Sequence, residues 1–430
     1  MTLKVLIVTY YWPPAGGPGV QRWLKFVKYL RHYGVEPVVF TAENPVYPLT
    51  DVTLEKDIPE GTEIIKCCIT EPNAILSKFK KSNVQNSMGF LNPNPSLFEK
   101  LLLYIRANFF IPDARMFWVK PSVRKLERYL EENEVDALIT TGPPYSVHLI
   151  GWHLKKRLAI KWIADFRDPW TSVDYFHLLP LSQKSIKKHH DLEDLVVRDA
   201  DSVLMVSNHA KQKYKDKASL IDVITNGYDE DNDFVKEDTV VDSKFTLTYI
   251  GMMSSERNPK VLWEVLSEIS ESDSNFKDDF VLRFIGKIDD TVSKSLKESN
   301  IKNIEKIGYV PHNDAKRFQR KSQVLLIVVN DYPSAKEMIP GKTFEYLQAR
   351  RPILGIAPTE GDLADIIRQT KSGEVFSYHA NKRKLRSYIL KLYKCYKNEG
   401  IEMLTEDISQ FHRKKLTQKL VTFIQKTIKN

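Results

Sequence analysis

The chain has 430 residues, of which 42% are hydrophobic and 11% aromatic, so it is long enough to bury a sizeable core and to form two domains. Its 64 lysines and arginines against 55 aspartates and glutamates give a net charge of +9, which suits a nucleic acid, an anionic membrane surface or a phosphorylated ligand. The three cysteines, Cys67, Cys68 and Cys395, exclude a disulfide framework and a CxxC metal site.

The first residues, MTLKVLIVTYYWPP, contain an apolar run that is far too short to span a bilayer. No later run reaches the necessary length. We therefore expect a cytoplasmic protein, and a peripheral attachment to the inner face of the membrane stays open.

Short apolar runs alternate with helical stretches along the whole chain, which favours parallel sheets with helices on both faces. A helix is predicted over VQRWLKFVKYLRHYG, where apolar residues recur at helical spacing. Strands are predicted at 4–10, 36–42, 62–68, 136–141, 161–166 and 202–207, and then at 245–251, 280–286, 304–310, 323–329 and 351–357. The pattern predicts an α/β protein with two successive open units.

The junction between the two units is predicted in the charged, aperiodic segment 229–244. The first domain would take 1–228 and the second 245–407, with a C-terminal helix from about 408 to 430 crossing back to the first. The junction contains a DxD triplet, Asp229-Glu230-Asp231, followed by Asp233. Metal-dependent sugar-nucleotide enzymes use such triplets, but in a linker a chance match is the better interpretation, and we predict no metal.

The segment from Pro72 to Phe117 has a lysine-rich part, SKFKKSNVQNS, and an aromatic, amphipathic part that begins at Leu97. Three interpretations of the second part stay open: a cover over an acceptor site, a helix on a membrane surface, or an ordinary helix packed on its domain.

The stretch KEMIPGKTFEYLQARRPILG places Glu337 and Glu345 eight positions apart. On one helix the two acids would differ in direction by about 80°. The intervening Pro340 and Gly341 instead predict that a new helix begins there, because proline is tolerated at the first helical position. The free amides at that helix start, together with Lys342, would form a phosphate seat beside Glu345. Ordinary surface ion pairs are the alternative.

The first βα connection reads TYYWPPAGGPGVQRW, and its Gly16 and Gly17 would let the backbone approach a ligand beyond a strand's carboxyl end. His148 follows a Gly-Pro-Pro turn after the fourth strand, where a site residue and a structural histidine are equally good interpretations. Asp165 and Arg167 follow the fifth strand, where substrate contact and an internal ion-pair cluster explain them equally well.

In the second half, Arg257 and Lys260 lie near a predicted helix start after Gly251. Two cations oppose the helix dipole there, which favours a bound anion, and solvated surface charge is the alternative. Together these residues predict a ligand site at the carboxyl edges of both sheets, facing one interdomain cleft.

The spacing of Glu337 and Glu345, with PGKTFEYLQARRPIL, PPAGGPGVQR and DFRDPW in this order, resembles retaining glycosyltransferases of the two-Rossmann-domain (GT-B) type, family 4, in a bacterial surface-polysaccharide subgroup. The resemblance covers nearly the whole chain. Two departures stand out. Gly251 is followed by Met252 instead of arginine, and Glu337 is followed by Met-Ile-Pro-Gly instead of a glycine-rich loop.

The resemblance implies a role for each matched residue of the donor site. Glu345 would bind the nucleotide ribose, Glu337 would lie near the donor sugar, and Arg257 with Lys342 would bind the diphosphate. The amide of Gly341 would assist at the helix start.

For the first domain, Gly16 and Gly17 would approach the diphosphate or the acceptor, and His148 would lie near the reacting sugar. From their place after the fifth strand, and not from the resemblance, we also predict that Asp165 and Arg167 contact substrate.

We therefore predict a retaining, hexosyltransferase-type glycosyltransferase of surface polysaccharide biosynthesis, without a metal or any cofactor beyond its UDP- or GDP-linked donor. Its partners would be that donor, a glycan or lipid-linked acceptor and an anionic membrane surface, but no nucleic acid. Three alternatives stay open: a sugar-nucleotide epimerase of the same fold, a non-catalytic basic protein binding a surface or a nucleic acid, and an inactive transferase homologue.

Overall fold

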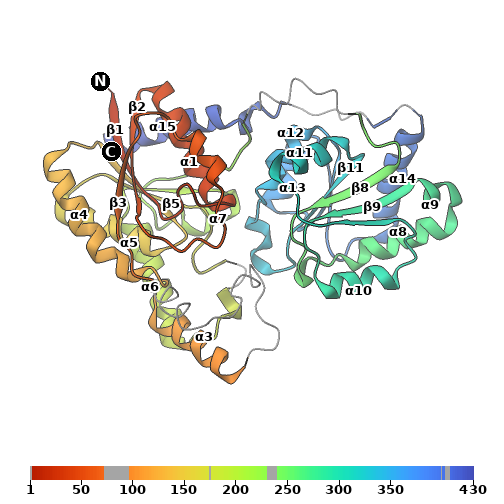
Figure 1. The fold of residues 1–430 in the computed structure, drawn as a ribbon, viewed down its shortest axis with the longest axis horizontal. Helices are drawn as coiled ribbons and strands as arrows, with labels where there is room; N and C mark the ends of the chain where they lie inside the picture. Colours follow the sequence, from red (N-terminus) through yellow and green to blue (C-terminus); the bar gives the residue numbers. More distant parts are fainter. Residues whose placement is uncertain (1, 72–95, 174–175, 230–239, 399, 402–406) are drawn as a thin grey trace. The chain divides into compact units, whose positions relative to one another are not determined.

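The computed structural model describes residues 2–71, 96–173, 176–229, 240–398, 400–401 and 407–430 (Figure 1). These residues form two compact units, one of Met1–Asn226 with Arg413–Asn430 and the other of Gly227–His412. Each unit is an open parallel α/β sheet with helices on both faces, and each is described by itself.

The sheet of unit 1 has seven parallel strands in the order β3-β2-β1-β4-β5-β6-β7. The strands are β1 (Leu3–Val8), β2 (Val35–Ala42), β3 (Glu63–Cys67), β4 (Ala137–Gly142), β5 (Trp162–Phe166), β6 (Ser202–Met205) and β7 (Ile221–Val223). Its helices include α1 (Pro18–Leu30), α3 (Leu97–Phe109), α4 (Val119–Glu132), α5 (Ser146–Leu158), α6 (Gln183–Asp199), α7 (Asn208–Tyr214) and α15 (Arg413–Lys429).

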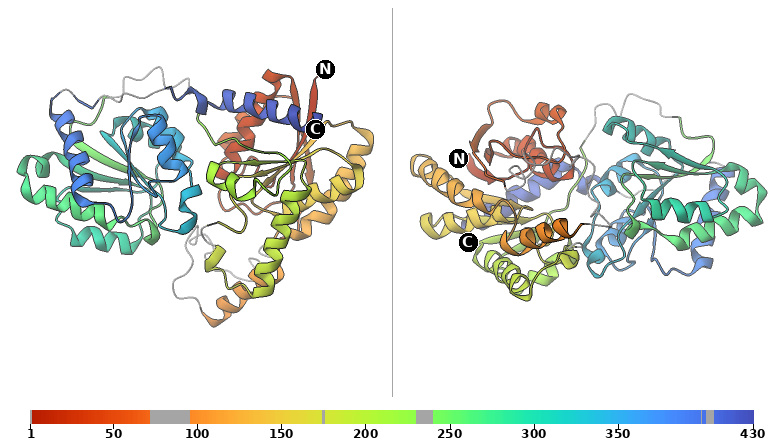
Figure 2. Two further views of the ribbon diagram at one scale, coloured as in Figure 1. Left: turned by 180° about the vertical axis from the view of Figure 1, so that it is seen from behind. Right: turned by 60° about the horizontal axis from the view of Figure 1, so that its bottom comes forward.

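Both faces of this sheet are covered, which explains why its strands are continuous apolar runs. Along β1, Val5 and Ile7 pack into the core under α1 and α15, whereas Leu6 and Val8 pack into the core under α4 and α5. This alternation follows from the two-residue period of a strand. Helix α15 buries Leu420 against α1, so the C-terminal residues complete one face of the N-terminal sheet (Figure 2).

The sheet of unit 2 has six parallel strands in the order β10-β9-β8-β11-β12-β13. They are β8 (Phe245–Ile250), β9 (Phe280–Ile285), β10 (Ile304–Ile307), β11 (Val324–Val328), β12 (Ile353–Ile356) and β13 (Gly373–Phe376). The helices are α8 (Lys260–Ser272), α9 (Ser274–Asp279), α10 (Asp290–Glu298), α11 (His312–Lys321), α12 (Lys342–Ala349), α13 (Asp362–Gln369) and α14 (Lys382–Asn398), with the short 3₁₀ turns η7 (Ser255–Arg257) and η8 (Pro333–Glu337) before α8 and α12.

In both sheets the chain starts in the middle, winds outward in one direction, and then continues from the middle in the other. The strand order therefore reverses between β1 and β4 in unit 1 and between β8 and β11 in unit 2. In open α/β sheets, ligands bind at this switch point, outside the carboxyl ends of the strands. The fold thus marks one candidate edge in each unit.

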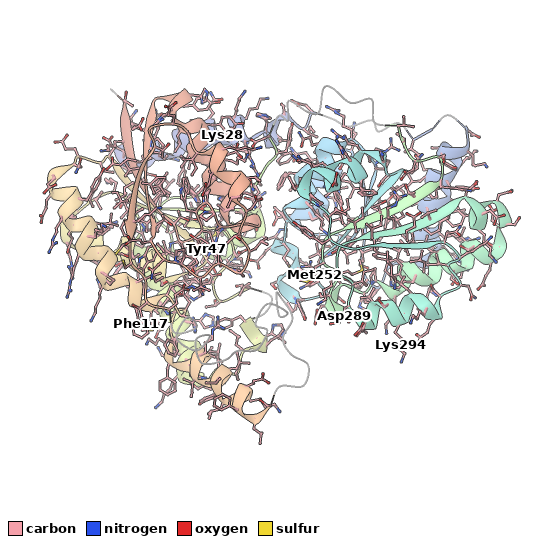
Figure 3. All side chains as sticks on the ribbon, in the orientation of Figure 1. Lys28, Tyr47, Phe117, Met252, Asp289 and Lys294 are labelled. Carbon is pink, nitrogen blue, oxygen red and sulfur yellow. The ribbon has the colours of Figure 1, made fainter. Side chains whose placement is uncertain are left out.

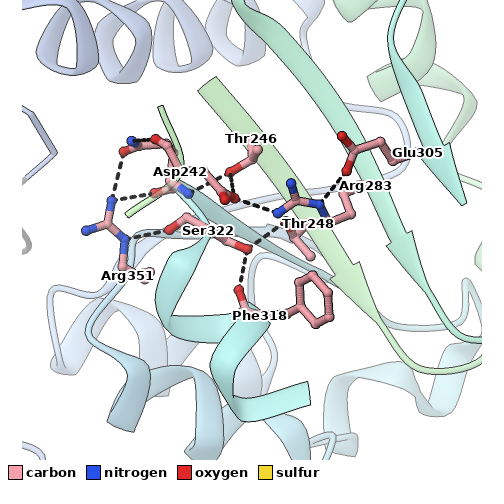
Figure 4. Close-up of polar contacts among 9 residues, drawn as sticks. Asp242, Thr246, Thr248, Arg283, Glu305, Phe318, Ser322 and Arg351 are labelled. Atoms are coloured by element: carbon pink, nitrogen blue, oxygen red, sulfur yellow. Dashed lines mark hydrogen bonds and ion pairs between the residues drawn. The ribbon is translucent and has the colours of Figure 1, made fainter. Parts of the chain in front are cut away.

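A polar network lies on the face of the unit 2 sheet that α11 covers (Figure 4). Arg283 of β9 donates to Asp242 at 2.5 Å and to Glu305 of β10 at 2.6 Å, and its guanidinium lies 5.7 Å from the centre of the Phe318 ring of α11. Burial opposes these charges, but the two carboxylates hold the pKa of Arg283 above its ordinary value. The network therefore fixes α11 and the residues before β8 to the sheet.

The predicted α/β fold with two Rossmann-like units is confirmed. Two short strands, β7 and β13, were not predicted, because three or four residues at a sheet edge give too little periodicity. In the described part of the chain, no helix is long and apolar enough to cross a membrane. Most of the predicted junction, including all but the first residue of its acidic cluster, falls on 230–239 and lies outside the described residues, as does the lysine-rich SKFKKSNVQNS.

Candidate functional site

Two glycines lie at the switch point of unit 2, directly after the ends of two neighbouring strands. Gly251 follows β8 and Gly286 follows β9, both with a φ of +115°, which L side chains rarely adopt. A Cβ atom on Gly286 would lie 2.6 Å from the carbonyl oxygen of Gly251. Both positions therefore require glycine, and the two chain turns pack closely beside the strand ends.

Lys342, the first residue of α12, lies directly over Gly251. Its Nζ donates to the carbonyl oxygen of Ile250 at 2.7 Å and lies 3.8 Å from the centre of the Tyr249 ring. A Cβ atom on Gly251 would be 3.5 Å from the same Nζ, which is van der Waals contact. The cation is therefore held directly against the end of β8.

The electrostatic environment of the Lys342 amine favours the binding of an anion. Burial lowers the pKa of Lys342, and the positive charge of Arg257 lowers it further against the opposing effects of Tyr249 and Glu345. Burial would raise the pKa of Tyr249, but Lys342 and Arg257 hold it below its ordinary value. The two cations thus repel each other at this edge of the sheet, and an anion bound between them would reduce the repulsion.

Arg257, in η7, reaches the neighbouring strand end. Its Nε donates to Oδ1 of Asn330 at 2.6 Å, and Asn330 lies two residues beyond the end of β11. The hydroxyl of Tyr378 donates to the carbonyl oxygen of Val329 at 3.0 Å and closes the same edge. Lys342 and Arg257 therefore lie at the two strands between which the order of the sheet reverses.

The two predicted glutamates occupy different positions around this edge. Glu345, on α12, accepts a hydrogen bond from Nε2 of Gln319 at 3.0 Å and lies 3.9 Å from Nε2 of His312, so it faces α11 with part of its side chain exposed. Glu337 ends η8 and is 7% exposed. As predicted, a new helix begins between them, with Gly341 as the N-cap of α12. The amide of Thr343 is not one of the free amides at this helix start, because it donates to the carbonyl oxygen of Pro340.

In unit 1, the switch point is closed by Arg167. Its guanidinium donates to the carbonyl oxygens of Gly19, in the first turn of α1, and of Pro143, after β4. It also lies 5.5 Å from the centre of the Tyr11 ring. Arg167 therefore joins the loops that follow β1 and β4, the two strands at the reversal.

The glycines of the first loop have structural requirements of their own. Gly17 has a φ of +84° and is the N-cap of α1. The amide of Gly16 donates to the carbonyl oxygen of Leu49 at 2.8 Å, and a Cβ atom there would lie 2.9 Å from Cγ of Leu49. These contacts explain both residues without a ligand, so their contact with substrate stays a prediction.

Asp165 is fully buried and lies in the ion-pair cluster that was the alternative to substrate contact. It receives hydrogen bonds from the guanidinium of Arg22 at 2.8 Å, from Nε1 of Trp23 at 2.7 Å and from the hydroxyl of Thr141 at 2.9 Å. Burial opposes the charge, but Arg22 and these donors hold the pKa of Asp165 below its ordinary value. Its carboxylate anchors α1 to β4 and β5, and the structure gives it no surface for a substrate.

His148 is likewise fully buried. Its Nδ1 lies 2.9 Å from the hydroxyl of Thr140, its ring stacks on Phe166 at 4.6 Å, and a Cβ atom on Gly142 would lie 2.6 Å from its Nε2. Burial lowers its pKa to about 3. This geometry describes a neutral core histidine and does not favour the predicted role beside a reacting sugar.

Asn330 and Tyr249 are among the residues of the unit 2 edge that were not predicted as site residues. Asn330 follows a predicted strand, so the rule that selected Gly251 and Arg257 applies to it as well. Tyr249 carries no such signal, because an aromatic residue inside an apolar strand is typical of core packing. Met252, labelled in Figure 3, occupies the position where the resembling family has a cation.

No family model and no curated protein matches this sequence. Solved structures match its fold over nearly the whole chain. A sucrose-phosphate synthase from Thermosynechococcus elongatus has 13% sequence identity and a TM-score of 0.57, with 99% of this chain and 96% of that chain covered. S. aureus TarM, in complex with fondaparinux, alpha-GlcNAc-glycerol and UDP, has 11% identity and a TM-score of 0.58, with 98% and 99% covered.

A UDP-GlcNAc 2-epimerase from Methanocaldococcus jannaschii has 12% identity and a TM-score of 0.53, with 99% of this chain and all of that chain covered. At such identities, the likeness establishes the fold alone. This chain therefore has the GT-B fold, which glycosyltransferases and sugar-nucleotide epimerases share.

Proposed function

We propose that the protein is a glycosyltransferase that transfers a sugar from a nucleoside-diphosphate sugar to a glycan or lipid-linked acceptor, in the biosynthesis of a surface polysaccharide. The observation that carries the proposal is the pair of cations, Lys342 and Arg257, at the switch point of unit 2. A diphosphate is the anion that matches two cations fixed at adjacent strand ends beside the start of a helix.

The proposed role of these residues is to stabilise the charge of the leaving group. When the glycosyl bond breaks, negative charge builds on the nucleoside diphosphate while the sugar becomes oxocarbenium-like. Preorganised donors aimed at such a charge contribute about 10²–10³ in rate each. Lys342 and Arg257 supply this positive charge from side chains, so we propose a mechanism that needs no metal and no cofactor besides the UDP- or GDP-linked donor.

The remaining predicted roles are part of the same proposal. Glu345, partly exposed beside Lys342, would accept hydrogen bonds from the nucleotide ribose, and Glu337 would contact the donor sugar. The amide of Gly341 would bind the diphosphate. Retention of configuration, by attack on the face from which the diphosphate leaves, rests on the resemblance to retaining transferases.

In unit 1, we assign the edge after β1 and β4 to the acceptor, with Gly16 and Gly17 approaching it and Arg167 holding the loops in place. The resemblance supports this assignment, and the bracing of both loops by Arg167 agrees with it. Asp165 would then contribute indirectly, because its buried carboxylate fixes the orientation of α1. His148 would contribute by packing beneath the loop that follows β4.

The proposal is tested by incubating the purified protein with radiolabelled UDP- and GDP-sugars and lipid-linked acceptors without added metal. We expect acceptor-dependent release of the nucleoside diphosphate, and a product whose anomeric configuration, read by nuclear magnetic resonance, equals that of the donor. Lys342→Met should lower the turnover number by about 10²-fold or more. Release that is unchanged in this variant would refute the assigned site.

An epimerase is the second candidate, because solved epimerases share the fold over the whole chain. The two activities differ in their need for an acceptor. An epimerase converts the nucleotide sugar alone into its epimer, whereas a transferase forms product only with an acceptor present. Nuclear magnetic resonance of the nucleotide sugar after incubation without acceptor separates them.

A further inference from the structure

Helix α3 of unit 1 is built as a stable, separate element. Ser96 accepts a hydrogen bond from the amide of Glu99, and the Glu99 carboxylate accepts one from the amide of Ser96, which forms a capping box. At its other end, Asn108 donates to Pro180 at 2.8 Å and accepts from the amide of Ser182 at 2.7 Å. The capping box therefore stabilises the start of the helix, and Asn108 attaches its other end to the segment 180–182.

Although fixed, α3 buries none of its side chains, and its largest apolar residues face solvent. At 100° per residue these side chains occupy one stripe, about 140° wide. The exposed fractions are 85% for Leu97, 59% for Phe98, 54% for Leu101, 45% for Tyr104, 38% for Ile105 and 70% for Phe109. We call these six residues the α3 stripe. A contiguous apolar surface of this kind is uncommon unless something binds it.

The apolar surface continues beyond the helix. Phe110, directly after α3, contacts Phe117 with ring centres 5.9 Å apart, and Phe117 is 51% exposed (Figure 3). Leu178, 45% exposed, lies in the segment that Asn108 holds beside the end of α3. Exposed apolar side chains thus also occur in the two segments that lie next to the end of α3.

Cations lie at both margins of the α3 stripe. On the helix wheel, exposed Lys100 lies beside the Tyr104 margin and exposed Arg106 beside the Phe109 margin. The one acid of the helix, Glu99, is engaged in the capping box on the opposite side. An apolar stripe between basic margins matches the boundary of an anionic bilayer, where side chains enter the acyl region and amines stay with the headgroups.

We propose that the α3 stripe is a docking surface for an anionic lipid bilayer, with Lys100 and Arg106 at the headgroup level. The stripe lies in the plane of the membrane surface and does not cross it. The occupant is a lipid surface because the complementary features are exposed apolar side chains and flanking positive charge. The proposal is independent of the nucleotide site and goes beyond it.

The test is co-sedimentation of the full chain with vesicles of phosphatidylcholine alone or mixed equally with phosphatidylglycerol. We expect binding to the mixed vesicles that weakens at high salt, because the charge attraction is screened. Leu101→Glu with Ile105→Glu should reduce partitioning by more than about 100-fold. Lys100→Glu should reduce it by about tenfold, since each basic residue near an anionic surface contributes several-fold.

Matched controls lie in unit 2. Tyr309→Glu changes a side chain that is 86% exposed, and Lys294→Glu, on α10, reverses an exposed lysine (Figure 3); both should bind like the wild type. Hydrogen exchange adds a measurement without mutation: amides of α3, but not of α10, should gain protection with the mixed vesicles.

Nucleotide affinity and thermal midpoint of the α3 variants should equal those of the wild type, which separates a folding failure from lost docking. Three results would overturn the proposal: no binding of the wild type to either vesicle, binding that the α3 variants retain, or self-association that the α3 variants abolish without lipid. The last would assign the stripe to a second copy of this chain.

Discussion

Lys342 is the residue whose placement bears most on function. Its amine is fixed over Gly251 by the carbonyl of Ile250 and the ring of Tyr249. We expect Lys342→Met and Arg257→Met each to weaken nucleoside-diphosphate binding by about 10- to 100-fold, the contribution of a charge-assisted hydrogen bond. Lys336→Met is the control, because exposed Lys336 pairs with Glu360 at 3.2 Å, and it should bind normally. Fluorescence or calorimetric titration measures these affinities.

The lowered pKa of Lys342 predicts how the same affinity depends on pH. The protonated amine binds the anion, so affinity should fall as the pH rises through the lysine pKa, which lies below its ordinary 10.5. Deprotonation of Tyr249, whose pKa is also lowered, would add negative charge and act in the same direction. Titrations between pH 7 and 10 should show the fall, and Lys342→Met should flatten it. Affinity that rises with pH would contradict the placement of the amine.

His148 makes a separate prediction about stability. Its pKa is about 3 in the folded chain and near 6.5 when unfolded, so below pH 6.5 the unfolded state binds the extra proton. The free energy of unfolding should therefore fall as the pH drops from 6.5 toward 3, by up to about 1.4 kcal/mol per pH unit from this group. His148→Gln should lose that part of the pH dependence in urea unfolding. An equal slope in both proteins would show that the histidine is not buried as described.

For single residues, the sequence predicted which side chains lie near the sheet edge better than it predicted how deeply they are buried. Glycines and cations after strand ends were identified because strands end at one sheet edge, and Gly251, Arg257 and Lys342 do meet there. The sequence left open whether His148 and Asp165 are buried, because their burial depends on contacts with Phe166 for the histidine and with Arg22 and Trp23 for the aspartate.

Among the elements, α15 links the end of the chain to its beginning. Leu420 is fully buried in the core with α1, so Leu420→Ala should lower the free energy of unfolding of unit 1 by about 2–5 kcal/mol. The neighbouring Lys419 is exposed, and Lys419→Ala should change the free energy of unfolding by less than about 0.5 kcal/mol. Chemical denaturation measures both. Equal stability of the two variants would mean that α15 is not part of the core.

Most elements could be predicted because a buried parallel strand is a continuous apolar run. The predicted strands extend too far at their carboxyl ends: Tyr10 and Val329, for example, lie beyond β1 and β11 and are still buried. At this edge of each sheet, residues remain buried after the hydrogen bonds between strands have ended. Apolar composition therefore does not distinguish the last residues of a strand from the buried residues that follow it. The edge strands β7 and β13 were missed because three or four residues give too little periodicity.

For the whole molecule, the division of contacts predicts how fragments behave. Unit 2 is one continuous stretch, 227–412, and contains Lys342, Arg257 and both glutamates. We expect this fragment to fold alone and to bind a nucleoside diphosphate within about threefold of the full chain, because the proposed diphosphate contacts all come from it. Residues 1–226 without α15 would expose the apolar face of α1 and should fold poorly. A fragment 227–412 that folds but does not bind would place the site elsewhere.

The central claim is that a nucleoside diphosphate binds at the edge of β8 and β11. The most direct measurement is calorimetric titration of the full chain with UDP, GDP and ADP without added metal, repeated with Lys342→Met, Glu345→Ala and the control Lys336→Met. We expect selective binding of one nucleotide, weakened at least tenfold in the first two variants and unchanged in the third. No binding of any nucleotide, or binding that neither Lys342→Met nor Glu345→Ala weakens, would contradict it.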